Sequence, residues 1–324
     1  MTKAIRIHAY GGPEVMKWED VPTPDPGPGE ALIHHEAVGL NYIDVYFRTG
    51  LYKSPSMPAT LGMEGAGTVI AVGADVTDIA PGDRVAYATG PIGAYATERV
   101  IAADRLVKLP DAIDFATGAA MMLQGMTAQY LLRRTYRVQP GETILVHAAA
   151  GGVGLILCQW AKYLGATVIG VVSTEAKAAI AQAHGADHVI IGHDHLAADV
   201  RKITGGAMVP VVYDSVGKDT FMHSLDSLSP LGMMVIYGNA SGPVPPFDVG
   251  ILAAKGSLFL TRPTLATYTA KRADLVAVAG DLFDAVISGA VKIRVNQTFP
   301  LAHAADAHIA LEARQTTGST VLVP

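Results

Sequence analysis

The sequence has little that could build a disulfide framework, a metal cluster or a nucleic-acid surface. It has one cysteine, Cys158, which excludes an intrachain disulfide and any zinc site made from several cysteines. Only 16% of its 324 residues are charged, the net charge is −5, and no block of five or more Lys or Arg residues occurs. The basic surface of a dedicated nucleic-acid binder is therefore missing. No secretory signal is recognisable, so we expect a globular, cytoplasmic protein with room for two domains.

One stretch, Thr143 to Ala161, runs for 19 residues without a charge. Its length could in principle cross a bilayer. It contains His147, Gln159 and three glycines between positions 151 and 154, which suit a buried strand, a sharp turn and a helix better than a membrane span. We therefore expect no membrane segment here.

The hydrophobic pattern changes along the chain. The first 110 or so residues contain short apolar runs separated by Pro and Gly turn signals, which is typical of β structure. From Gly141 onward, Val/Ile-rich runs alternate with helical stretches, which predicts a parallel sheet covered on both faces. The predicted domains are 1–124 (β-rich), 125–262 (doubly wound α/β) and 263–324 (a return to the first domain), and a cleft between domains is the default binding site.

The turn after the first strand of the parallel unit carries a nucleotide-binding pattern. Ala149-x-Gly151-x-x-Gly154 follows a strand, opens a helix, and matches the dinucleotide fingerprint with Ala at its first position. Gly151 lets the backbone approach a pyrophosphate, and Gly154 lets helix and strand pack closely. The helix N-terminus adds free N–H groups and a partial positive charge. A dinucleotide site is therefore predicted.

The end of the next strand indicates which dinucleotide. NAD sites usually place an Asp or Glu there for the ribose 2′-hydroxyl. This strand ends in Ser173-Thr174, and Lys177 follows, while Glu175 belongs to the first turn of the helix. Small hydroxyls and a lysine suit a 2′-phosphate, so we favour NADPH, although Lys177 taken alone is better explained as a solvated helix residue.

Several motifs together resemble one family. They are "AYGGPEVM", "GLNYIDVYFRTGLY", "LGMEGAGTV", "PGDRVAY", "HAAAGGVGLILCQWAK", "VVYDSVGKDTF" and "RQTTGSTVLVP", and they span the whole chain. The chain resembles the zinc-free quinone oxidoreductases, the zeta-crystallin-like group of the medium-chain dehydrogenase/reductase superfamily. The resemblance implies an α/β fold in which a Rossmann-type doubly wound parallel sheet is inserted in a GroES-like β-rich catalytic domain. It also implies an NADPH-dependent quinone reductase.

The resemblance bears on zinc as well. Zinc alcohol dehydrogenases of the superfamily hold metal ligands in two of these motifs, where this chain has Asn41 and Met63. Neither suits zinc, and the four-cysteine structural lobe is missing, so a zinc-independent reaction with no bound metal is expected. Cys158 is expected to be an inert buried thiol.

Candidate site residues also follow from the resemblance. The substrate is expected beside the "NYIDVYFRTGLY" segment, with catalytic candidates Asn41, Asp44, Tyr46 and Tyr52. Asn41 or a tyrosine hydroxyl could bind a developing oxyanion, or these residues could only cap a turn and pack. The cofactor-binding candidates are Thr127, Ala150, Gly151, Gly152, Val153, Gly154, Ser173, Lys177, Gly238, Asn239, Ser241 and Arg314.

One position departs from the group. Relatives place an aromatic ring or His where this chain has Gly192, and His193 is one residue along. The histidines at 184, 188, 193 and 195 lack metal-ligand spacing, and His34 and His35 face opposite ways in a strand. We expect none of them to chelate a metal.

Alternatives to quinone reduction remain open. One is NADPH-dependent reduction of α,β-unsaturated carbonyls, and another is a dinucleotide-binding protein that acts through RNA, which the acidic net charge disfavours. The apolar segment "GSLFLTR" is predicted to be an edge strand through which a homodimer forms.

Overall fold

The computed structural model describes residues 2–23 and 25–324, which fall into two compact units. Unit 1 contains the described residues up to Met126, Tyr268–Ile287 and Ile293–Pro324, and unit 2 contains Thr127–Thr267 and Ser288–Lys292. The predicted domain boundaries, after residues 124 and 262, lie two and five residues before these limits and stay a prediction. The sequence analysis places Ser288–Lys292 in the C-terminal return, whereas here Gln159 holds Lys292 through two hydrogen bonds, of 2.9 and 3.2 Å.

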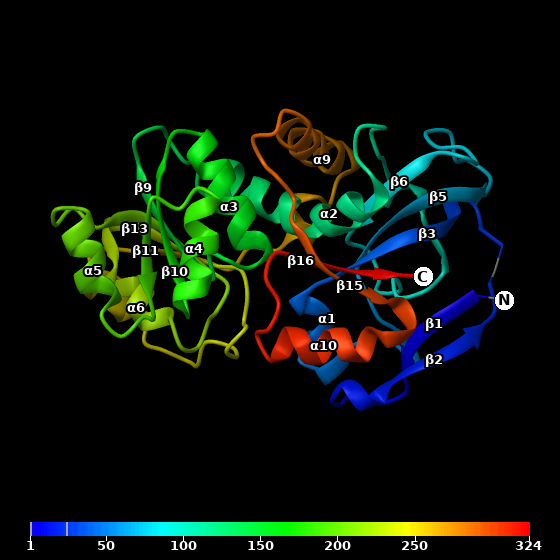
Figure 1. Cartoon of the computed structure of the whole chain (residues 1–324), viewed down its shortest axis with the longest axis horizontal. Coiled ribbons are helices and arrows are strands. Elements are labelled where there is room, and N and C mark those ends of the chain that lie inside the picture. Colours follow the sequence, from blue (N-terminus) through cyan, green and yellow to red (C-terminus); the bar gives the residue numbers. More distant parts are fainter. Residues whose placement is uncertain (1, 24) are drawn as a thin grey trace. The chain divides into compact units, whose positions relative to one another are not determined.

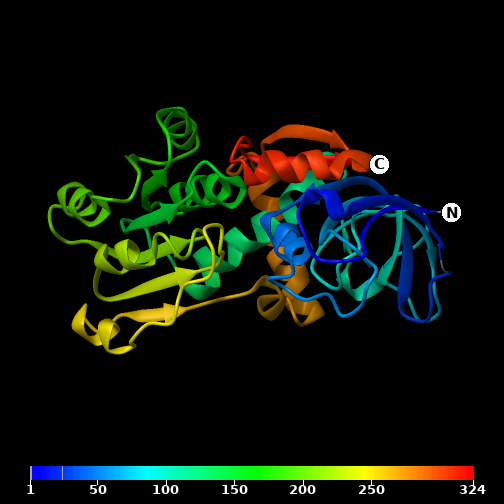
Figure 2. The ribbon, with the colours of Figure 1, turned by 90° about the horizontal axis from the view of Figure 1, so that it is seen from below.

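Unit 2 is built on a six-stranded parallel sheet. Its strands are β9 (Thr143–His147), β10 (Thr167–Val172), β11 (His188–Ile191), β12 (Val209–Asp214), β13 (Leu228–Ile236) and β14 (Phe259–Thr261). Their spatial order is β11-β10-β9-β12-β13-β14, and every pairing is parallel. This order reverses direction between β9 and β12, as in doubly wound sheets. The predicted doubly wound fold is confirmed, and β14 lies at an edge of the sheet (Figure 2).

Helices cover both faces of this sheet. They are α3 (Gly152–Tyr163), α4 (Glu175–Ala183), α5 (Leu196–Ile203), α6 (Phe221–Asp226) and α7 (Gly250–Ala254). Figure 1 shows α3 and α4 on one side of the strands and α5 and α6 on the other. Because the strands are covered twice, residues such as Ile169, Val212 and Met234 are buried in continuous runs rather than in alternation.

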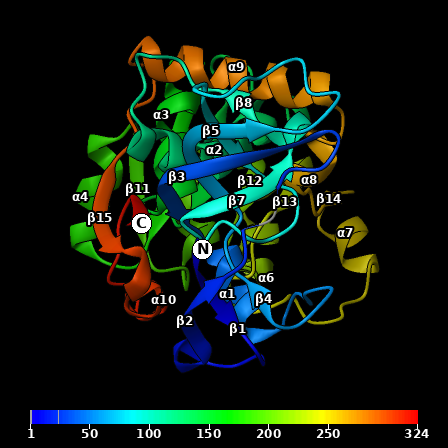
Figure 3. The same cartoon turned by 90° about the vertical axis from the view of Figure 1, so that its right-hand side faces the viewer.

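Unit 1 contains two further sheets. The first, of order β2-β1-β4, consists of β1 (Thr2–Ile7), β2 (Met16–Val21) and β4 (Ala59–Thr60). The second sheet has the order β15-β16-β3-β5-β6-β8, and β7 also pairs with β3. Its strands are β3 (Glu30–Leu40), β5 (Glu64–Val72), β6 (Arg84–Ala88), β7 (Glu98–Ala102), β8 (Val107–Lys108), β15 (Val295–Pro300) and β16 (Ser319–Val323). Figure 3 shows β3 beside β5 and β7. Strand β16 pairs antiparallel with β3, so a segment from the C-terminal part of the chain joins a sheet whose other strands include β3 and β5.

Helices of unit 1 include two that the sequence analysis does not anticipate. They are α1 (Tyr42–Thr49), α9 (Arg272–Ile287) and α10 (Ala304–Glu312), while α2 (Phe115–Tyr130) and α8 (Leu265–Tyr268) carry the chain between the units. Short 3-10 turns occupy Pro13–Val15, Ala103–Arg105 and Leu301–His303, and a π-helical turn, Leu131–Thr135, follows α2. The unexpected helices are α10 and α1, and α1 is capped by Gly50 with φ +80°.

The uncharged run from Thr143 to Ala161 forms β9, the glycine turn and most of α3. In the described part of the chain, no helix has both the length and the apolar character needed to span a bilayer. The predicted strand, turn and buried helix are therefore confirmed for this run.

Trp160 tests how strongly unit 2 depends on α3. Its side chain is 1% exposed, whereas Tyr163 on the same helix is 65% exposed. We expect Trp160→Ala to lower the free energy of unfolding by about 3–5 kcal/mol because it empties a large buried volume. Tyr163→Ala is the control and should change it by less than about 0.5 kcal/mol. Urea titrations followed by circular dichroism measure both, and equal effects would contradict this assignment of the core.

Candidate active site

The glycine turn after β9 brings backbone atoms unusually close together. A Cβ added to Gly154 would lie 2.2 Å from the carbonyl oxygen of Ala148 and 2.8 Å from the Ala149 Cα. A Cβ on Gly151 would lie 3.2 Å from the same oxygen. Ala148 itself has φ +49°, the left-handed region. Only glycine fits at position 154, because the helix and the strand end are in close contact there. Gly151 has no side chain that would cover the backbone where the helix begins.

Helix α3 begins at this turn with no acidic residue in its first turn. Its first intrahelical bond runs from the Leu155 N–H to the Gly151 carbonyl, at 2.9 Å. The N–H groups of the preceding helical residues have no partner further back in the helix, and the helix dipole adds positive potential there. The turn from Ala150 to Gly154 therefore suits an anion such as a pyrophosphate.

The residues after β10 lie at the same edge of the sheet. Thr174 is the N-cap of α4, and its hydroxyl accepts a hydrogen bond from the Lys177 backbone N–H at 3.3 Å. Ser173 and Thr174 are exposed, and Lys177 is half-buried. The next strand ends nearby, since the Gly192 N–H donates to the Val172 carbonyl at 2.9 Å and Gly192 has φ +80°. The exposed Ser173 hydroxyl and the Lys177 ammonium group thus follow β10, the second strand of the parallel unit.

A buried carboxylate, which the sequence analysis missed, fixes the residues that follow β12 at the same edge of the sheet. Asp214 is the last residue of β12, and its Oδ1 accepts the backbone N–H groups of Val216 and Gly217 at 2.7 and 3.0 Å. Its Oδ2 accepts the hydroxyls of Thr220 and Ser224 at 2.7 and 2.9 Å. Because the Ser224 hydrogen goes to Asp214, His147 donates its Nε2–H to the Ser224 oxygen, 2.9 Å away. The only sequence signal was an aspartate directly after an apolar strand.

The loop after β13 packs on the loop after β12. A Cβ on Gly238 would lie 2.5 Å from the Ser215 carbonyl oxygen, so only glycine fits. The Ser241 hydroxyl donates to the Val216 carbonyl at 2.9 Å and accepts from the Asp219 N–H at 3.0 Å. Ser241 therefore holds two loops together, and its contact with a cofactor stays a prediction.

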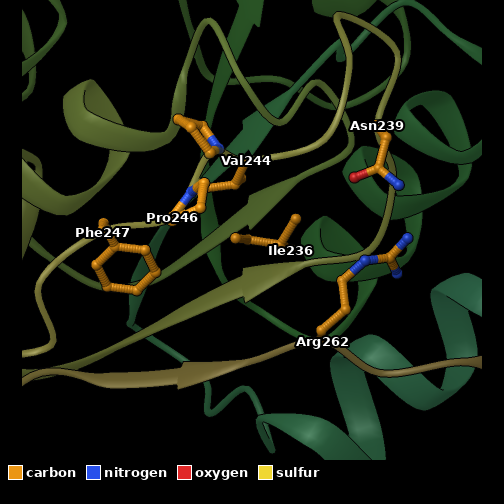
Figure 4. A pocket seen from close by; sticks show the side chains of 7 residues that line it. Ile236, Asn239, Val244, Pro246, Phe247 and Arg262 are labelled. Atoms are coloured by element: carbon orange, nitrogen blue, oxygen red, sulfur yellow. The ribbon is translucent and has the colours of Figure 1, made fainter.

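Asn239 lines a pocket of about 530 Å³ at the carboxyl ends of β13 and β14. Figure 4 shows the polar ends of Asn239 and Arg262 turned toward each other, with apolar side chains across from them. The lining consists of Ile236, Asn239, Val244, Pro245, Pro246, Phe247 and Arg262. Apolar walls with two polar groups are typical of a small-molecule site.

In unit 1, the predicted catalytic residues belong to α1 and its flanks. Asn41 precedes the helix and is 5% exposed. Its Nδ2 donates to Glu64 Oε2 at 2.6 Å, and its Oδ1 accepts from Gln124 at 3.1 Å. Glu64 also accepts the Leu123 backbone N–H at 2.7 Å, and burial raises the pKa of its carboxyl to about 8. The Asn41 carboxamide thus lies inside a polar network that the sequence analysis did not foresee.

Asp44 belongs to a second buried network. Its Oδ2 accepts the Asn41 backbone N–H at 2.9 Å and the Tyr95 hydroxyl at 3.0 Å, and burial raises its pKa to about 7. Arg48 can only donate, so His308 Nδ1 accepts from it at 3.0 Å and Nε2–H donates to the Tyr95 oxygen at 3.1 Å. Burial, and then Arg48, lower the His308 pKa to about 3. The chain of donors anchors α1, and direct action of Asp44 on a substrate stays a prediction.

Three tyrosines form an aromatic row on α1 and the loop beyond it. The ring centroids of Tyr42 and Tyr46 are 5.6 Å apart, and those of Tyr46 and Tyr52 are 5.3 Å apart, edge to face. The Tyr52 N–H donates to the Tyr46 carbonyl at 3.0 Å, which fixes the loop against the helix. Tyr46 is 8% exposed, so most of its ring packs inside unit 1.

Thr127 and Arg314 belong to other elements than the cofactor candidates just described. Thr127 is buried within α2, and Arg314 follows α10 in unit 1 with φ +58°. Their contact with a cofactor stays a prediction.

The residues considered as metal ligands do not gather into a cluster. Within residues 2–23 and 25–324, no three His, Cys, Asp or Glu side chains are placed to hold a metal ion. Cys158 is fully buried, as expected, and burial raises the pKa of its thiol to about 12. His35 is buried and His34 is exposed, on opposite faces of β3 as expected.

Comparison with known proteins places this geometry in a family. Residues 152–278 match the model of zinc-binding dehydrogenases, and residues 27–111 match the alcohol dehydrogenase GroES-like domain. The chain is 54% identical to a quinone oxidoreductase of Pseudomonas aeruginosa, with all of both chains covered. It is 46% identical to a 2-haloacrylate reductase of a Burkholderia species, covering 100% of this chain and 99% of the relative. A solved structure of Escherichia coli quinone oxidoreductase complexed with NADPH is 47% identical, covers both chains fully and has a TM-score of 0.97.

The GroES-like domain and the doubly wound sheet define a medium-chain dehydrogenase/reductase, and within that superfamily the chain belongs to the quinone oxidoreductases. The expected resemblance and the expected fold class are confirmed.

Two glycines of the turn give a matched test. We expect Gly154→Ala to destabilise the protein by about 1–3 kcal/mol, since its Cβ meets backbone that must move. Gly151→Ala has a longer 3.2 Å contact and should cost less than about 1 kcal/mol. Denaturant unfolding of the two variants measures the difference. A larger loss in Gly151→Ala would show that the close contact is misassigned.

Proposed function

We propose that the protein is an NADPH-dependent quinone oxidoreductase. The observation that carries the proposal is the edge of the parallel sheet in unit 2. There helix α3 begins at the glycine turn and has no acidic residue in its first turn. Ser173 and Lys177 follow the next strand, β10. The turn binds the pyrophosphate through backbone N–H groups, and the Ser173 hydroxyl and Lys177 ammonium bind a 2′-phosphate. The NADPH complex of the Escherichia coli relative supports this choice of cofactor.

NADPH supplies a hydride when bound, and a quinone that takes up a hydride and a proton becomes a hydroquinone. We propose that the aromatic row of Tyr46 and Tyr52 orients the planar substrate ring, with Asn41 and Asp44 holding α1 in place. A tyrosine hydroxyl of this row donates a hydrogen bond to the oxygen that gains charge. The names of the Pseudomonas aeruginosa and Escherichia coli relatives support a quinone.

We also propose that the reaction needs no zinc. The Asn41 carboxamide is engaged with Glu64 and Gln124, and Met63 offers only a thioether. Zinc prefers thiolate, imidazole and carboxylate ligands, so the donor set at these two positions fits it poorly. A cytoplasmic location is part of the same proposal, because Cys158 is the only cysteine and is buried.

The direct test is stopped-flow oxidation of NADPH with 1,4-benzoquinone. We expect rapid oxidation that a zinc chelator leaves unchanged, because hydride transfer to a quinone needs no Lewis acid. An α,β-unsaturated carbonyl measured in parallel tests the second candidate, which the 2-haloacrylate reductase relative favours. Activity on the enone with none on several quinones would replace the first substrate class by the second.

Lys177 tests the choice of cofactor. We expect Lys177→Ala to weaken NADPH binding about tenfold, because a charge-assisted contact with the 2′-phosphate is lost, and to leave NADH binding nearly unchanged. Fluorescence titration of both cofactors measures the dissociation constants. Lys202, exposed on α5, gives a control variant, Lys202→Ala. Equal weakening of NADPH and NADH would remove Lys177 from the phosphate site.

We further propose a homodimer formed through β14. This strand ends the sheet of unit 2, pairs with β13 on one side, and carries Phe259, which is 57% exposed. An unpaired apolar edge suits pairing with a second copy about a twofold axis. Light scattering should give twice the chain mass, and Phe259→Lys should give monomer, while the control Tyr163→Lys should stay dimeric. A monomeric wild type would contradict the proposal.

A further inference from the structure

Two histidines at the carboxyl edge of the sheet in unit 2 have no part in the function proposed above. His193 follows β11, and His223 lies in the first turn of α6. Their ring centroids are 5.1 Å apart with planes inclined by 59°. Both side chains are half-buried, so each ring packs on the protein and also faces solvent.

The position of His193 follows from strand register. Ile191 is paired with Val172, the last residue of β10, and the Gly192 N–H donates to the Val172 carbonyl at 2.9 Å. By this register Gly192 lies beside Ser173, the first residue after β10, and His193 follows Gly192 directly. A Cβ added to Gly192 would have no heavy atom within 4 Å, so the space around that position is open.

The position of His223 is set by the Asp214 network. Its neighbour Ser224 bonds both Asp214 and His147, which fixes the first turn of α6 at the carboxyl edge. Burial lowers the pKa of His147, the nearby Asp214 carboxylate raises it in part, and His193 and His223 lower it by a smaller amount. The two half-exposed rings thus lie close to the end of β9, where the glycine turn begins.

We infer that His193 and His223 bind the 2′-phosphate of NADPH together with Ser173 and Lys177, and so separate NADPH from NADH. The inference rests on the proposed function. Two imidazoles beside one ammonium group supply N–H donors and positive charge to a phosphate dianion. The adenosine 2′-hydroxyl of NADH has neither the charge nor the oxygens to use them. Rings that only stacked on the adenine would bind both cofactors equally.

The test is calorimetric titration of the full chain with adenosine 2′,5′-bisphosphate and with adenosine 5′-monophosphate, followed by NADPH and NADH. The variants are His193→Asn, His223→Asn and the double substitution. Each single variant should weaken the bisphosphate and NADPH about tenfold, and leave the monophosphate and NADH within about twofold. The control is His188→Asn, an exposed imidazole at the opposite, amino end of β11, which should change nothing.

Three outcomes are informative. Selective loss of the 2′-phosphate ligands supports the inference, and the unchanged NADH affinity shows that the variants are folded. Equal loss for both classes of ligand, or no loss in the double variant, overturns it while the proposed function stands. A wild type that binds NADPH no better than NADH contradicts the choice of cofactor itself.

Discussion

The carboxylate of Asp214 is the contact on which the nucleotide edge of unit 2 depends. It is fully buried, and it accepts two backbone N–H groups and two hydroxyls from residues that follow it in the chain. A buried carboxylate is stable only when its oxygens are satisfied in this way. Through these bonds one side chain positions the loop after β12, the start of α6 and, by way of Ser224, His147 at the end of β9. The loop after β13 then packs on this frame through Ser241 and Gly238.

Unit 1 uses the same physical device twice. Glu64 and Asp44 are both fully buried. The Asn41 side chain and the Leu123 N–H of α2 donate to Glu64, and the Tyr95 hydroxyl and the Asn41 N–H donate to one oxygen of Asp44, Oδ2. Together these bonds hold α1 at its first turn. The helix carries Tyr42 and Tyr46, so a short element with few contacts of its own can present aromatic rings in one fixed arrangement. The proposed substrate site therefore depends on buried carboxyl groups that hold α1 in place.

How much was predictable differs between the units. The alternation of Val/Ile runs with helices, and the glycine turn after β9, predicted the parallel sheet because the backbone pattern of a doubly wound fold is local and repeats. Helices α1 and α10 were missed because each is only eight or nine residues long, too short for a sequence pattern to separate a helix from the β structure around it. The polar networks were missed for another reason: Asn41 and Gln124, or Arg48 and His308, are far apart in sequence and nothing local links them.

The sequence by itself determined the fold class, the place of the dinucleotide turn and the chemical types available at the zinc positions, since each is a property of contiguous residues. Tertiary structure alone decided what the polar side chains do. It placed the Ser241 hydroxyl between two loops, enclosed Asp44 in a hydrogen-bond chain, and brought His193 to His223. The physical reason is that a hydrogen bond or ring contact requires atoms to meet within a few ångströms, and only folding brings distant segments that close.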